Sequence, residues 1–272
     1  MASAPQQQPN LPLFYNDLMP LNTRDHAGYK SRQSKTANWL ANQHAVPLTA
    51  DEFGQAQRFF PIVFSQGDNP VPLALMGLNE GVNTFVDKKG KLRDEAVYLP
   101  AYVRRYPFLL ARLNKDSEDM SLCFDPSGNL VGESKDGELL FDSEGKPTEH
   151  CQAIMGFCER FEQAGQRTQQ MVEELKKHDL LMDGEVAIQP QGQGDKPFVY
   201  RGFRMVQLEK LQNLPAETLT EWNKNGLLML IHAHLLSLDL MRVIFAKQVE
   251  QGTAPKPTEA NQTAAPVEIK PN

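Results

Sequence analysis

Cysteine is scarce in this chain of 272 residues, and Cys123, Cys151 and Cys158 form neither a Cys-x-x-Cys pair nor a dense framework. Such sparse, odd-numbered cysteine is typical of a reducing compartment and not of disulfide-rich secreted domains. The first ten residues contain no basic region followed by an apolar stretch, so they do not resemble a cleaved secretory signal. We therefore expect a cytoplasmic protein.

Positive charge is also in short supply, because the formal net charge is −6 at pH 7. Nucleic-acid-binding proteins gain most of their affinity by neutralising phosphates with clustered lysine and arginine, so we expect no nucleic-acid partner. The acidic excess is concentrated over residues 115–150. We interpret this segment as a solvated face, with docking of a basic partner as the alternative.

Several well-known catalytic signatures are missing from the sequence. It contains no glycine-rich dinucleotide or phosphate-binding loop, no Gly-x-Ser-x-Gly elbow and no His-Glu-x-x-His zinc motif. His232 and His234 would point in nearly opposite directions on a helix, so a metal site would require the fold to bring Cys151 and Cys158 to them. We expect neither a metal site nor a cofactor.

One apolar run, residues 226–245, has about the length needed to cross a bilayer. It carries His232, His234, Asp239 and Arg242. Ionisable groups at mid-depth in lipid cost about 2.5 kcal/mol or more each. We therefore expect a buried or half-buried helix and no membrane span.

The two ends of the chain differ in composition from the rest. Residues 1–10 and 251–272 are rich in Pro, Gln, Thr and Ala and poor in large apolar residues, which predicts disorder. No linker divides the remainder, so we expect a single domain over 11–250. Buried-strand patterns at 59–65 and 71–78 precede long helical patterns. This order predicts an α+β fold, with an antiparallel, hairpin-rich sheet packed against long C-terminal helices.

An Asp-x-x-Gly pattern recurs after three apolar segments. It predicts three hairpins, in which the Asp side chain opens a turn and the Gly takes the left-handed conformation. A calcium loop beginning at Asp125 is the alternative, but Leu130 occupies a position where such a loop needs glycine. The three turn pairs are Asp87 with Gly90, Asp125 with Gly128, and Asp142 with Gly145.

Helix signals begin at Thr49 and Glu52, which have the spacing of a capping box. Apolar periodicity, an initiating proline and a terminating Asn-Gly pair mark the later helices. Short strands are predicted at 186–188 and 198–206. The later helices are predicted over 149–178, 215–225 and 227–249.

Two adjacent arginines, Arg104 and Arg105, stand between Tyr102 and Tyr106. Paired guanidinium groups beside aromatic rings can hold a carboxylate or phosphate in a bidentate fork while they stack on the rings. Pro107 suits the first turn of a helix, which would place the pair next to an anion-attracting helix N-terminus. These four residues are the candidate binding site for a small anionic ligand or a protein partner. Structural pairing with acidic loops is the alternative.

A rival candidate lies on the last predicted helix. His232 and Asp239 share one helix face and could act as a base and its orienting group, with His234 beside them in sequence. Ser237 lies off that face. A buried polar network that fixes the register of a core helix explains the same residues, so we lean towards a non-enzymatic protein.

Four segments carry a family resemblance. They are PLALMGLNEGVNTFVD (72–87), YVRRYPF (102–108), RGFRMVQLEKLQNLP (201–215) and GLLMLIHAHLLSL (226–238). Through these segments the chain resembles the SapC family of bacterial proteins over nearly the whole of its globular part.

The resemblance implies a soluble accessory or binding protein of a Gram-negative bacterium. Members of the family are often encoded beside TonB-dependent receptors, tryptophan-halogenase-like flavoproteins and cupin-like proteins, which implies a part in nutrient uptake or modification. The family name implies a surface-layer component as a further alternative. A transporter permease that shares the name is a different protein, because this chain has no credible set of membrane spans. The resemblance supplies no catalytic residues.

Overall fold

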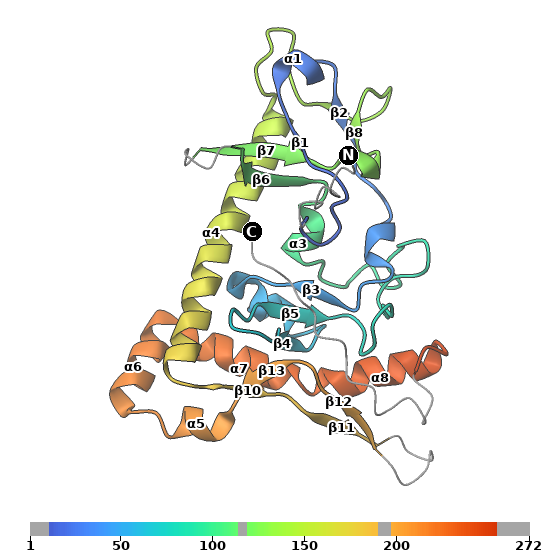
Figure 1. Cartoon of the computed structure of the whole chain (residues 1–272). Helices are drawn as coiled ribbons and strands as arrows, with labels where there is room; N and C mark the ends of the chain where they lie inside the picture. Colours follow the sequence, from blue (N-terminus) through green and yellow to red (C-terminus); the bar gives the residue numbers. More distant parts are fainter. Residues whose placement is uncertain (1–10, 114–118, 190–196, 255–272) are drawn as a thin grey trace, which may run out of the picture. The chain divides into compact units, whose positions relative to one another are not determined.

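The computed structural model describes residues 11–113, 119–189 and 197–254 (Figure 1). They form helices and antiparallel sheets, so the predicted α+β fold is confirmed. The chain divides into two compact units, each assembled from separate stretches of sequence. The described parts of the first unit fall within 1–33 and 106–158, and those of the second within 34–105 and 159–268. The single domain predicted over 11–250 stays a prediction. The ends predicted to be disordered lie almost wholly outside the described residues.

The first unit contains two small sheets and the start of the longest helix. The strand orders are β1-β7-β6 and β8-β2-β9, and every pairing is antiparallel. Helix α4 contributes its residues up to Cys158 to this unit. The elements are β1 (Met19–Pro20), α1 (Thr23–His26), β2 (Lys30–Ser31), β6 (Phe108–Arg112), β7 (Met120–Phe124), η3 (Pro126–Gly128), β8 (Val131–Gly132), β9 (Glu138–Leu139) and α4 (Glu149–Lys177).

The core of the first unit follows from the two-residue period of β6 and β7. Phe108 lies opposite Phe124, and Leu110 lies opposite Leu122, so these four side chains point to the same face of the pair. Apolar side chains from the two hairpin regions and from α4 complete the cluster. The other buried members are Val131, Leu140, Phe141, Cys151 and Cys158.

The prediction that a helix begins at Pro107 is wrong. The residues that follow it, Phe108–Arg112, form the strand β6. Leu109 lies opposite Cys123 in the β6–β7 ladder, where β7 supplies hydrogen-bond partners along one edge of β6. The local signal at Pro107 is real, but a helix here would expose the apolar face that the sheet buries. The arginine pair therefore precedes a strand.

Two of the three predicted turns are confirmed. Gly90 and Gly145 are left-handed, with φ of +76° and +77°, and each turn carries a β-bridge across its base. The turn at Asp125 differs, because the left-handed residue is Asn129 and the chain continues into β8, which pairs with β2. Gly128 serves another purpose: a Cβ there would meet the Tyr106 hydroxyl at 2.5 Å.

The second unit is built on a five-stranded antiparallel sheet of order β10-β13-β4-β5-β3, and a separate hairpin pairs β11 with β12. Figure 1 shows the α7–α8 run beside this sheet, and α7 packs against β4 and β13. The strands are β3 (Ala45–Pro47), β4 (Ile62–Phe64), β5 (Pro72–Leu75), β10 (Leu181–Asp183), β11 (Val186–Ile188), β12 (Phe198–Tyr200) and β13 (Arg204–Val206). The helices are η1 (Asn38–Leu40), η2 (Ala50–Glu52), α2 (Phe53–Ala56), α3 (Ala101–Arg104), α5 (Leu208–Gln212), α6 (Ala216–Asn225), α7 (Leu227–Ser237) and α8 (Leu240–Glu250), together with the rest of α4.

The helices predicted over 149–178 and 215–225 are confirmed, and Gly226 closes the second of them in the left-handed conformation. The last predicted helix is instead two helices, α7 and α8. At their junction the backbone N–H of Leu238 donates to the carbonyl of Leu235, and that of Met241 donates to Leu238. Each of these hydrogen bonds joins residues three positions apart, whereas α-helical bonds join residues four positions apart. The backbone therefore forms a tighter helical turn at the junction.

Within the described residues, the run Leu227–Glu250 is long and apolar enough to cross a membrane by length and composition alone. In the structure, 39% of its most apolar window is buried inside the protein. Its buried side chains include Ile231, His234 and Met241. The half-buried helix expected from the sequence is what the structure contains.

Gly90 tests the turn geometry. A Cβ at Gly90 would lie 2.2 Å from the carbonyl carbon of Ala37, and its φ of +76° already disfavours a side chain. We expect Gly90→Ala to lower the free energy of unfolding by more than about 1 kcal/mol in urea titrations. Gly54→Ala is the control, because nothing lies within 4 Å of its Cβ in α2, and it should raise stability by about 0.5–1 kcal/mol. Equal stability of the two variants would contradict this account.

Candidate functional site

The arginine pair lies at the C-terminal end of a short helix. Pro100 precedes α3, Arg104 is its last residue, and Arg105 is its C-cap. The expectation that the pair stands beside a helix N-terminus is therefore wrong. A helix C-terminus carries partial negative charge, which favours the two guanidinium groups at this position.

Arg105 is buried, with only 4% of its surface exposed. Its guanidinium carbon lies 4.4 Å from the ring centre of Tyr102 and 4.3 Å from that of Phe161, so aromatic rings pack against it. Its Nη1 lies 3.4 Å from Oε1 of Glu162 on α4. Burial raises the pKa of the Glu162 carboxyl, and the Arg105 charge opposes that rise. Arg105 is thus a packing residue of the second unit, as the structural alternative proposed.

Arg104 is exposed and held in one position. Its Nε donates to the carbonyl of Leu99 at 2.9 Å, and its Nη2 donates to the Tyr98 hydroxyl at 3.3 Å. The guanidinium carbon also lies 5.7 Å from the centre of the Tyr98 ring. The structure therefore separates the two arginines. Arg105 is buried in the core, and Arg104 lies exposed against Tyr98.

Glu52 organises the backbone behind Arg104. This carboxylate is 6% exposed and accepts hydrogen bonds on both oxygens. Oε1 accepts from the Tyr98 hydroxyl at 2.9 Å and from the Ala101 N–H at 2.6 Å, and Oε2 accepts from the Thr49 N–H and hydroxyl, both at 2.9 Å. Burial, together with this carboxylate, raises the pKa of Tyr98 to about 12. The capping box predicted from the sequence is present, and its glutamate also fixes the start of α3.

Tyr102 and Tyr106 do not face a common site. Tyr102 packs edge-on against Phe161 in the second unit. Tyr106 belongs to the first unit, where its hydroxyl donates to Oδ2 of Asp125 at 3.3 Å. Asp125 is fully buried and also accepts from the backbone N–H groups of Asn16 and Ser127 at 2.8 Å. Burial and the Asp125 charge raise the pKa of Tyr106 to about 12.

His234 is sealed inside the second unit, with none of its surface exposed. Its Nε2 accepts from the Val206 N–H at 3.0 Å, so Nδ1 carries the proton and donates to the Ile62 carbonyl at 2.8 Å. Ser237 Oγ accepts from the Ile62 N–H at 2.8 Å and donates to the His234 carbonyl. Burial lowers the pKa of His234 to about 4. Both ring nitrogens are used to join α7 to β4 and β13.

His232 and Asp239, the other candidates on these helices, are exposed. The structure does not bring them together with His234. Across residues 11–113, 119–189 and 197–254, no group of three or more His, Cys, Asp or Glu side chains could hold a metal ion.

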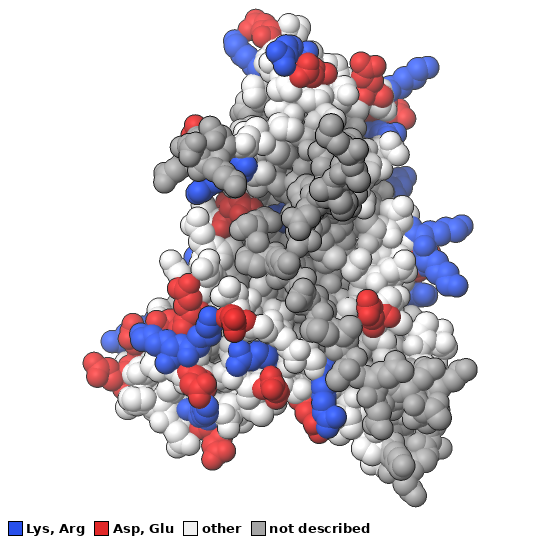
Figure 2. All heavy atoms as spheres, in the orientation of Figure 1, with Lys and Arg blue, Asp and Glu red and all other residues white. Residues whose placement is uncertain are grey.

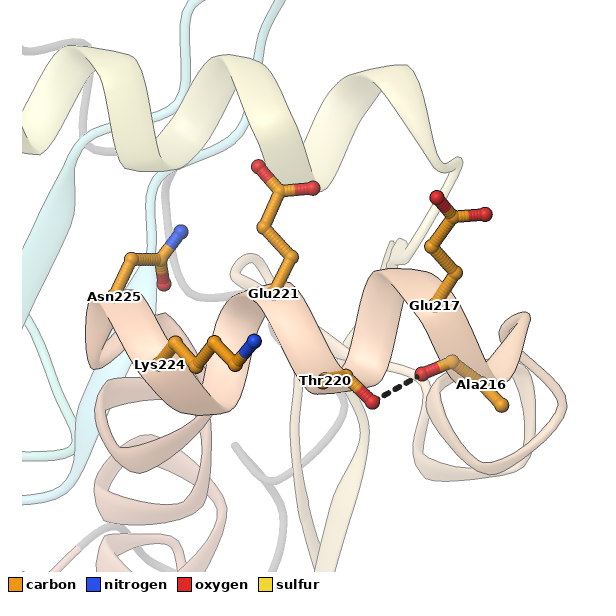
Figure 3. A pocket seen from close by; sticks show the side chains of 6 residues that line it. All are labelled: Ala216, Glu217, Thr220, Glu221, Lys224 and Asn225. Carbon is orange, nitrogen blue, oxygen red and sulfur yellow. Dashed lines mark hydrogen bonds between the residues drawn. The ribbon is translucent and has the colours of Figure 1, made fainter.

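Two hollows among the described residues of the second unit differ in size and lining. One, of about 610 Å³, lies along α6 alone, and Figure 3 shows Glu217 and Glu221 extending from the same side of that helix. In Figure 2, acidic and basic side chains alternate around α5 and α6 without an extended area of one sign. Another cavity, of about 40 Å³, is lined mainly by apolar side chains and by Tyr200 and His44. It has room for a few waters at most.

Comparison with protein families gives one match. The SapC family model matches residues 21–244, which is most of the chain. The chain belongs to the SapC family. The search of curated proteins returned no match for this SapC-family protein, and the search of solved structures returned none either.

Tyr98 is the residue of the candidate site that sequence analysis missed. It lies six positions before Arg104, outside the arginine–tyrosine run, and it holds Arg104 in place. A tyrosine just before a Leu-Pro-Ala helix start is a weak signal. Only the distant partner Glu52 shows why it is fixed.

Replacing Glu52 tests whether its carboxylate organises the segment that carries Arg104. In Glu52→Gln, an amide group would face some of the four donors, so we expect a loss of about 3 kcal/mol of unfolding free energy in urea titrations. Glu95→Gln, an exposed neighbour in the same unit, should change stability by less than about 0.5 kcal/mol. A Glu52→Gln protein as stable as Glu95→Gln would show that the hydrogen bonds at Glu52 contribute little.

The lowered pKa of His234 predicts that the protein loses stability at acidic pH. Its pKa is about 6.5 in the unfolded chain and about 4 in the folded protein, so unfolding takes up a proton between these pH values. The stability is complete above pH 6.5 and falls by about 3 kcal/mol as the pH drops towards 4. Urea unfolding at pH 7 and pH 4.5 should show this fall in the wild type and in His232→Gln. His234→Gln should lack it, and the same fall in all three proteins would refute the assignment.

Proposed function

We propose that this SapC-family protein is a binding protein that uses Arg104, presented on Tyr98, to hold an anionic group of a ligand or protein partner. The observation that supports this most directly is an exposed guanidinium fixed by Leu99, by the Tyr98 hydroxyl and by the Tyr98 ring. A side chain that is already ordered loses less conformational entropy when it binds. Planar guanidinium groups also match the geometry of carboxylate and phosphate.

The proposed setting is an accessory role in the cytoplasm, serving a TonB-dependent uptake or modification system. The family resemblance supports the role, and the free, buried thiols of Cys123 and Cys151 support a reducing compartment as the location. A surface-layer component remains the alternative. We do not propose an enzyme at His232, His234 and Asp239, because His234 uses both ring nitrogens on backbone groups.

The proposal is tested by affinity capture from a lysate of the source organism, with mass spectrometry of captured proteins and small molecules. Wild-type, Arg104→Ala and Arg58→Ala proteins serve as baits. Arg58 is also an exposed arginine of the second unit, so it controls for the loss of one positive charge. We expect Arg104→Ala to lose at least about tenfold of a captured species that the other two baits retain, equivalent to about 1.4 kcal/mol.

Competition identifies the chemistry of the captured species. Added inorganic phosphate or acetate should release it from the wild-type bait if Arg104 holds an anionic group. Equal capture by all three baits, or capture that neither anion reduces, would overturn the proposal. Arg105 is left unchanged, because its burial means that a substitution there would also disturb folding.

A further inference from the structure

In the first unit a serine, a histidine and a glutamate side chain lie next to one another. The proposed function does not involve them. Ser31 Oγ lies 2.5 Å from Nε2 of His150, and Nδ1 of the same ring lies 3.6 Å from Oε2 of Glu138. All three residues belong to the first unit. In sequence they are far apart, since the Ser31–His150 contact spans 119 positions.

The sheet explains why these residues meet. Ser31 lies on β2, the central strand of β8-β2-β9, and Glu138 is its directly opposed partner on β9. Opposed residues of an antiparallel pair project from the same face, so one histidine can reach both side chains. His150 is in the first turn of α4, which Thr148 caps by accepting from the Cys151 N–H. The close approach at Ser31 depends on Gly137, where a Cβ would lie 2.5 Å from the Ser31 carbonyl oxygen.

The two nitrogens of His150 have different partners, and this sets the proton positions. A carboxylate near Nδ1 favours the tautomer with the proton on Nδ1. Nε2 then accepts the hydroxyl proton of Ser31. This is the order of nucleophile, base and orienting acid in serine hydrolases, which are recognised by geometry and not by sequence position.

The contacts of this cluster also differ from those of four buried polar side chains elsewhere in the protein. His234, Ser237, Asp125 and Glu52 each bond backbone groups that the fold leaves unpaired. Among the described residues, the Ser31 hydroxyl and the His150 ring contact side chains only. Within the described part of the chain, no hydrogen bond from this cluster reaches a backbone group, so it does not replace a missing backbone partner as those four side chains do.

We propose that Ser31, His150 and Glu138 form an acyl-transfer site that acts on small carboxylic esters. Ser31 Oγ attacks the ester carbonyl carbon and passes its proton to Nε2 of His150. The ester C–O bond breaks, His150 returns the proton to the departing alkoxide, and the acyl group stays on Ser31. Water, deprotonated by the same nitrogen, then attacks the acyl carbon. The bond between that carbon and Ser31 Oγ breaks, and His150 returns the proton to Oγ, which releases the carboxylic acid and free Ser31.

The burial of the serine limits the size of the substrate. Ser31 is 7% exposed, whereas the side chains of His150 and Glu138 are 23% and 69% exposed. Only a narrow acyl group can reach Oγ, while the leaving alcohol can remain at the surface beside His150. We therefore infer that the substrate is a short-chain ester and not a peptide or a long-chain lipid.

The test uses the full-length protein and a fluorophosphonate probe, which Ser31 would attack at phosphorus with loss of fluoride. Intact-mass and tandem mass spectrometry should show one adduct, on Ser31, in folded wild-type protein and none after heat denaturation. Ser31→Ala should lose the adduct, and His150→Gln should form it about 100-fold more slowly because a general base is removed. Ser143→Ala, an exposed serine of the same unit, should label like the wild type.

A second measurement uses p-nitrophenyl acetate, which should release a burst of one nitrophenolate per chain in the wild type and none in Ser31→Ala. Folded wild-type protein without an adduct on Ser31 would overturn the proposal, as would His150→Gln that labels at the wild-type rate. Arg104→Ala should label normally. The outcome of the test of this site is therefore independent of the outcome of the test of the proposed binding surface.

Discussion

The structure depends on buried side chains that satisfy backbone groups which its short strands leave unpaired. The described strands are two to five residues long, so many N–H and C=O groups at their ends have no neighbour in a ladder. Leaving such groups buried and unpaired would be costly. Polar side chains bond to them instead: His234 and Ser237 at Ile62, Gln248 at Leu78, Asn83 at Leu40 and Phe85, Thr168 at Ala50, and Asp125 at Asn16.

This constraint explains why residue types that suggest chemistry are used for structure here. A histidine, a serine and an aspartate two to seven positions apart on a predicted helix resemble a catalytic set. In the folded chain, His234 and Ser237 face the sheet, and Asp239 faces outward beyond a tightened helical turn. Arg105 follows the same logic, because aromatic packing and Glu162 stabilise its charge inside the unit.

The residues of the two proposals lie in different units. The second unit presents Arg104 through a chain of contacts that runs from Glu52 through Tyr98. The first unit holds Ser31 and His150 together without a backbone partner. The proposed binding surface needs an exposed, charged environment and the proposed reactive serine needs an enclosed one, and Arg104 and Ser31 lie in such environments in separate units.

The sequence by itself determined the elements that local patterns control. The strands at 62–64 and 72–75, the helices α4 and α6, the capping box at Thr49 and the left-handed Gly90 and Gly145 all follow from periodicity, capping and turn chemistry. The tertiary structure alone decided that residues 108–112 form a strand, that Arg104 and Arg105 separate, and that Ser31 meets His150. The physical reason is distance along the chain: a ladder partner, a buried carboxylate or a facing histidine far away in sequence leaves no local pattern to detect.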